Sequence, residues 1–218
     1  MTEPDVTLTD YGLFAECAAF AWLLARGPAT LDTLRRWAVL FFSFTALAAL
    51  LGGTVHGFFA TDSGGIGRVL WKLSMIAVGG AALAGWAIAA RLLLAADGAD
   101  RVVGVATGLA ALYAAVILFV NDAFWVAVVG YVPAAAVLLA AFLRAAVRER
   151  TSWATLGACG LALSFVATAV QQRRIALHPE YFDHNALYHL VQAVALALVF
   201  LACRGLLATT GGLHADTA

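Results

Sequence analysis

The chain has 218 residues, of which 63% are hydrophobic and 12% charged, against about 45–50% and about 25% in soluble domains. This composition excludes a soluble globular enzyme, a disordered protein and a disulfide-rich secreted module, and it predicts an all-α polytopic membrane protein. Because the 13 basic and 13 acidic residues cancel, no basic surface is available for nucleic acid, and membrane lipids are the expected partners.

Seven apolar segments have about the 20 residues that a helix needs to cross a membrane, and none shows the alternation typical of a β-barrel strand. We expect the chain to form one seven-transmembrane-helix bundle over residues 11–207, between a short N-terminal segment 1–10 and a flexible tail 208–218. In chain order the predicted helices are Tyr11–Arg26, Arg36–Ala60, Gly67–Ala95, Arg101–Val120, Asp122–Val147, Ser152–Gln171 and Asn185–Leu206.

Basic residues at the two ends of these helices are divided unequally. Nine of the 13 arginines and lysines fall on the side of the C-terminus and four on the side of the N-terminus. Cytoplasmic loops of membrane proteins carry an excess of Lys and Arg. We therefore predict that the N-terminus lies outside and the C-terminus lies in the cytoplasm, with the protein in the bacterial inner membrane.

Polar and ionisable residues gather at the outer ends of the predicted helices. His56 lies near the outer end of the second helix, Asp62 lies in the following loop, and a run from Asp183 to Gln192 opens the seventh helix. Ionisable groups inside membrane spans are costly and often mark functional sites. The pattern predicts a site in the outer half of the bundle.

Within the seventh helix, Asn185, His189 and Gln192 are spaced i, i+4 and i+7, which places them on one face. Because a polar face cannot look into lipid without a penalty of several kcal/mol, we expect it to face the bundle and contact a cofactor or ligand. His184 is about 140° round the helix from His189. It can share a site with His189 only at a non-helical entry to the span, which Asp183, a good N-cap residue, would provide.

The histidines suggest a metal site. Imidazole is the commonest neutral metal ligand, so His56, His184 and His189 are candidate zinc ligands. A single histidine near a helix end is more often a hydrogen-bonded or interfacial residue, and that interpretation stays open for each of the three. A b-type haem held between His56 and His189 is a further alternative.

Two strings carry a family resemblance: Gly52-Gly-Thr-Val-His56-Gly-Phe58 and Asp183-His-Asn-Ala-Leu-Tyr-His-Leu-Val-Gln192. In a seven-helix chain they resemble the CREST superfamily of alkaline ceramidases and adiponectin-receptor/haemolysin III proteins, at its bacterial edge. The resemblance implies an intramembrane zinc hydrolase in which His56 and His189 bind the metal. Asn185 occupies the position of the family's other seventh-helix histidine, and Gly52 and Gly67 those of a ceramidase serine and aspartate.

Two functions therefore compete. The first is a zinc-dependent hydrolase of a lipid amide or ester, in which zinc activates a water molecule and Asp62 or Asp183 serves as general base. The second is a non-enzymatic receptor, sensor or scaffold. In that case the His/Asn/Gln cluster binds a small ligand or locks the second helix to the seventh.

Overall fold

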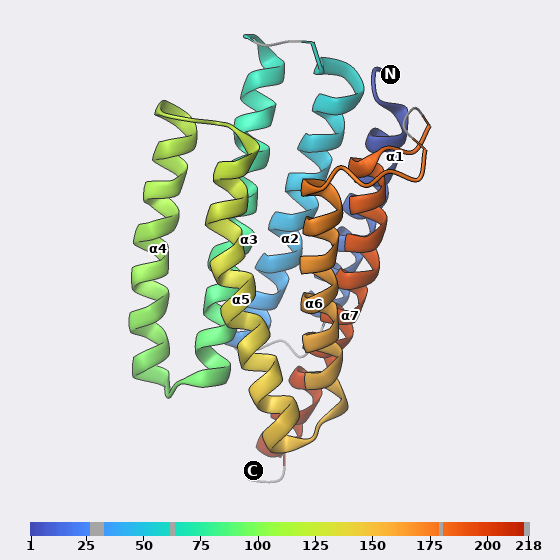
Figure 1. The fold of residues 1–218 in the computed structure, drawn as a ribbon. Helices are drawn as coiled ribbons and strands as arrows, with labels where there is room; N and C mark the ends of the chain where they lie inside the picture. The colour runs from blue at the N-terminus through green and yellow to red at the C-terminus, as the bar shows by residue number, and fades with distance from the viewer. Residues whose placement is uncertain (27–32, 62–63, 179–180, 216–218) are drawn as a thin grey trace.

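The computed structural model describes residues 1–26, 33–61, 64–178 and 181–215. In these residues seven α-helices run alternately up and down in one bundle, and the two termini lie at opposite ends (Figure 1). The helices are α1 (Pro4–Ala25), α2 (Thr33–Thr54), α3 (Ile66–Leu93), α4 (Ala96–Phe119), α5 (Phe124–Glu149), α6 (Ser152–Gln172) and α7 (His184–Ala215). A π-helical segment, η1 (Val55–Phe59), continues α2.

All seven helices are long and apolar enough to cross a membrane. Large hydrophobic side chains remain exposed on the outside of the bundle, for example Val105, Leu109 and Leu112 on α4. A surface of apolar side chains can face lipid. The backbone of each helix can do so as well, because a helix satisfies its own backbone hydrogen bonds and needs no water. The predicted all-helical fold with seven helices long and apolar enough to span a membrane is confirmed, whereas the side of the membrane on which each terminus lies stays a prediction.

Two predicted helix ends differ from the structure. Helix α1 begins at Pro4, seven residues before Tyr11, so most of the predicted N-terminal segment forms the first two turns of α1. The N–H groups of the first helical turn have no partner within the helix, so proline, which lacks this group, loses no hydrogen bond there. The negative charge of the nearby Asp5 interacts favourably with the positive end of the helix dipole. At the other end, α7 continues past Leu206 to Ala215, so the predicted tail is helical up to that residue.

The helices pack around two regions of different character. Helix α3 contacts α2, α4 and α5, α6 packs along α7, and α1 packs against α2 and α7. Fully buried apolar side chains such as Phe41, Phe42 and Phe142 fill the half of the bundle toward the C-terminus. The buried polar residues Thr7, Asp10 and Ser74 instead lie toward the N-terminus.

Glycines allow α1 to approach α2 and η1 closely. A Cβ atom added to Gly53 would lie 2.8 Å from the Cβ atom of Asp10, and one added to Gly57 would lie 2.9 Å from Cγ2 of Thr7. These distances are too short for real side-chain contacts, so any larger residue would push α1 outward. The glycines therefore hold the face of α1 that carries Asp10 against the second helix.

Candidate functional site

A cavity of about 360 Å³ lies in the half of the bundle toward the N-terminus. Its volume is in the usual range of small-molecule pockets. Every helix except α4 contributes to its lining. The polar and aromatic lining residues are Asp10, Thr45, His56, Trp71, Ser74, Phe124, Tyr131, Ser164, Thr168, Gln171, Asn185, Tyr188, His189 and Gln192. Alanine, valine, leucine, methionine and glycine complete the lining.

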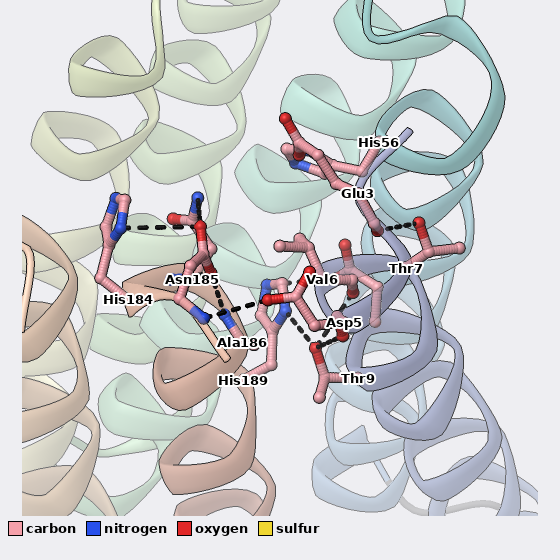
Figure 2. Close-up of polar contacts among 12 residues, drawn as sticks. Glu3, Asp5, Val6, Thr7, Thr9, His56, His184, Asn185, Ala186 and His189 are labelled. Atoms are coloured by element: carbon pink, nitrogen blue, oxygen red, sulfur yellow. Dashed lines mark hydrogen bonds and ion pairs between the residues drawn. The ribbon is translucent and has the colours of Figure 1, made fainter. Parts of the chain in front are cut away.

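Asp10 and His189 form a buried pair on this lining. Asp10 is only 4% exposed, and its Oδ1 atom lies 3.2 Å from Nε2 of His189. On the other side of the imidazole, Nδ1 lies 3.2 Å from the hydroxyl of Thr9 (Figure 2). The Thr9 hydroxyl can donate to the carbonyl of Asp5, 2.9 Å away. When it does, Nδ1–H of His189 donates to Thr9, and one proton lies between Nε2 and the Asp10 carboxyl.

His56 lies in η1, at the end of the second span, and is paired with the start of the chain. Its Nδ1 atom lies 2.5 Å from Oε2 of Glu3, and the N–H of Thr2 donates to the carbonyl of Gly57 at 3.0 Å. The imidazole also meets Trp71 edge-on, with 6.3 Å between ring centroids. The first residues of the chain therefore hold His56 in place beside the cavity.

The predicted polar face of α7 does look into the bundle, because Asn185, His189 and Gln192 all line the cavity. The amide of Gln192 donates to the Ser164 hydroxyl at 3.2 Å, and that of Gln171 donates to Oδ1 of Asn185 at 3.4 Å. Both bonds join α7 to α6. They do not form the predicted lock between the second and seventh helices.

Asp183 is the N-cap of α7, as its residue type predicts. Its Oδ1 atom accepts hydrogen bonds from the backbone N–H groups of Asn185 at 2.8 Å and Ala186 at 2.9 Å. The Nδ1 atom of His184 lies 3.6 Å from Oδ2 of Asp183. Neither residue is among those that line the cavity, and Figure 2 shows His184 apart from His56 and His189. The helical phase, about 140° between residues five apart, explains why His184 points elsewhere.

The predicted zinc ligands are thus only partly brought together. In the described ranges, no group of three or more His, Cys, Asp or Glu side chains could hold a metal ion. His56 and His189 share the cavity, whereas His184 does not. The other predicted catalytic residue, Asp62, lies outside the described residues. Zinc binding stays a prediction, and these residues supply no complete ligand set for it.

A second polar group lies beside the cavity wall, where α3 meets the turn between α4 and α5. Arg68 donates from Nε to Oδ2 of Asp122 at 3.0 Å, and the Trp71 indole donates to the Asp122 carbonyl at 2.7 Å. The hydrogen bond from Arg68 holds the pKa of Asp122 below its usual value of 3.8. Lys72 adds a bond to the carbonyl of Leu118 at 2.7 Å. Together these contacts fix Trp71 on the cavity lining.

Comparison with known protein families supplies a family and no activity. The model of a family of unknown function, DUF6962, matches residues 6–208. The chain belongs to this family. No curated protein and no solved structure matches it. Because the matched range runs from the first turn of α1 well into α7, the family comprises the whole bundle around the cavity.

Proposed function

We propose that the protein is a membrane-embedded receptor or sensor that binds one small molecule in the cavity between α1, α2, α3, α5, α6 and α7. The single observation that carries the proposal is the cavity itself: about 360 Å³, with the buried Asp10–His189 pair on its wall. Pockets for small ligands combine an apolar lining with a few convergent polar groups. This lining has both.

The cost of such a cavity supports a functional role. A cavity leaves the atoms of its lining without packing partners, whereas apolar side chains in its place would pack more tightly. In addition, each buried polar group must recover its lost hydration through hydrogen bonds. Several lining groups have partners on neighbouring helices, among them Gln192, Asn185 and His189. These bonds give the wall a defined shape before any ligand arrives, which lowers the ordering cost of binding.

Ligand-induced stabilisation of the purified protein in lipid nanodiscs tests the proposal. A ligand at 100 times its Kd stabilises the folded state by about 2.7 kcal/mol. We expect Ala48→Leu, which places a larger side chain on the cavity lining, to abolish stabilisation by small molecules that stabilise the wild type. Ala111→Leu on the exposed surface of α4 is the matched control. Equal stabilisation of both variants would place the binding site elsewhere.

A zinc-dependent hydrolase of a lipid amide or ester is the competing proposal. It is supported by the placement of His56 and His189 on one cavity from different helices. Elemental analysis of the wild type beside His56→Ala and His189→Ala separates the two functions. About one zinc per chain, lost in both variants, would favour the hydrolase. Folded protein that contains no metal and is stabilised by small molecules would favour the receptor.

The membrane and its orientation form part of the same proposal. Insertion in the bacterial inner membrane with the N-terminus outside would open the cavity half of the bundle toward the outer leaflet. The support is the charge bias of nine basic residues against four, in line with the positive-inside rule. Cysteine labelling from each side, at a residue introduced next to the N-terminus, tests that orientation.

A further inference from the structure

The charge on the cavity lining is one-sided. Asp10 is its one carboxylic acid, and among the described residues that form it there is no lysine or arginine. The two histidines, His56 and His189, are its other titratable groups besides the tyrosines. A buried carboxyl group that lacks a fixed cation is costly unless a hydrogen-bond donor or a positive charge reaches it.

One oxygen of Asp10 is available for such a partner. His189 faces Oδ1, and among the described residues it is the only side chain that forms an ion pair with Asp10. Oδ2 lies beside Gly52, where an added Cβ atom would be 3.6 Å from Oδ2 and 3.6 Å from Oγ of Ser74. The Ser74 hydroxyl donates to the carbonyl of Ala48 at 2.9 Å, so its proton is already used. The missing side chain at Gly52 leaves space next to Oδ2.

Aromatic rings complete the surroundings. Trp71, Phe124, Tyr131 and Tyr188 line the same cavity from α3, α5 and α7, and the Trp71 and Phe124 rings lie 6.5 Å apart. The faces of aromatic rings attract organic cations, and this attraction is strongest where water is excluded. The neighbouring wall, which includes Val78 and Val128, is apolar.

We propose, on the basis of the proposed function, that the ligand is an organic ammonium ion. Its protonated amine nitrogen binds Oδ2 of Asp10, and its apolar body lies between α3 and α5. The ammonium group donates hydrogen bonds, and Oδ2 accepts one wherever the shared proton of the Asp10–His189 pair lies. Charge-assisted bonds of this kind are about twice as strong as neutral ones. A carboxylate ligand would meet Asp10 without a basic residue to compensate, and an alcohol would bring no positive charge of its own to the carboxyl group.

The experiment compares three probes with one carbon skeleton: 2-phenylethylamine, 2-phenylethanol and phenylacetate. The same comparison with hexylamine, hexanol and hexanoate tests whether the preference among the three head groups depends on the phenyl ring of the probes. Binding to the full-length protein in neutral-lipid nanodiscs is measured by calorimetry for the wild type, Asp10→Asn, Gly52→Ala and Gly12→Ala. An added Cβ atom at Gly12 has nothing within 4 Å, so this variant controls for the replacement of a glycine.

We expect each amine to bind the wild type at least about tenfold more tightly than its alcohol. Asp10→Asn, which keeps the size and replaces the ionisable carboxyl group by a neutral amide, should erase this preference while binding of the alcohol persists. Gly52→Ala adds a methyl group in ordinary contact with Oδ2 and should weaken the amine more than the alcohol. Gly12→Ala should match the wild type.

The outcomes separate this inference from the proposed function. Equal affinity for amines and alcohols, or an amine preference that survives in Asp10→Asn, would overturn the ammonium ligand and leave a small-molecule cavity. If none of the six probes binds, both the ammonium ligand and the proposed function fail. Unchanged thermal stability of Asp10→Asn and Gly52→Ala in the absence of probe verifies that the comparison involves folded protein.

Discussion

The contact between α6 and α7 leads to a quantitative prediction for Gly160→Ala. A Cβ atom at Gly160 would lie 2.7 Å from the backbone carbonyl oxygen of Ala195 and 2.9 Å from Cγ2 of Val199. The nearest atom belongs to the backbone of α7, so no rotamer change removes the overlap and the two helices must separate. Overpacking of this kind costs about 1–3 kcal/mol. Alanine regains up to about 1 kcal/mol of helix propensity, which leaves a net loss of about 0–2 kcal/mol for Gly160→Ala.

Gly104→Ala on α4 is the matched control, because nothing lies within 4 Å of a Cβ atom at Gly104. Both variants exchange the same residues inside a helix, so the difference between their free energies of unfolding isolates the overlap at Gly160. Unfolding in mixed micelles with a denaturing detergent, followed by tryptophan fluorescence, measures that difference. Equal free energies of unfolding for the two variants would refute the close helix contact.

Three further predictions concern residues around the cavity. Asp183→Ala should destabilise the protein by about 1 kcal/mol and Asp183→Asn by only a few tenths, since asparagine also caps helices; similar losses in thermal unfolding would contradict the capping role. A double-mutant cycle of Gln192→Leu and Ser164→Ala should give a coupling of about 0.6 kcal/mol, the average for hydrogen bonds between membrane helices, and zero coupling would exclude the bond. Because hydrogen bonding to Arg68 lowers the pKa of Asp122, Asp122 stabilises the fold above its unfolded-state pKa and loses this effect as pH falls through its lower folded-state pKa. The stability difference from Asp122→Asn, at most about 1 kcal/mol for so exposed a pair, should therefore shrink below about pH 4; a difference independent of pH would contradict the ion pair.

The spans and one face of the site could be predicted because both follow from local periodicity. Apolar length identifies each helix, and the spacing of Asn185, His189 and Gln192 identifies the inward face of α7 without knowledge of its neighbours. The capping role of Asp183 is equally local, since an N-cap contacts only the next turn.

The contribution of α1 could not be predicted from apolar length. The acidic stretch before Tyr11 lowers the mean hydropathy, so the predicted span begins one residue after Asp10, the residue that carries the cavity's carboxyl group. The pattern of Pro4 followed by Asp5 was a usable signal, because proline and an acidic residue are typical of a first helical turn. That Asp10 meets His189, 179 positions later in the chain, depends on how α1 packs against α7, which no local pattern encodes.

The same glycines that let α1 pack closely also determine the chemistry of the cavity. Gly53 lets the backbone of α2 approach to within contact of the Asp10 side chain, while Gly52, one residue earlier, leaves Oδ2 of Asp10 uncovered. A larger residue at Gly53 would move the carboxyl group away from His189, and one at Gly52 would cover it. Helix packing and ligand access at Asp10 are therefore set by adjacent positions that differ in how far they tolerate a side chain. At Gly53 a Cβ atom would overlap the side chain of Asp10, whereas at Gly52 it would make an ordinary contact. This difference allows the cavity chemistry to be altered without disrupting the bundle.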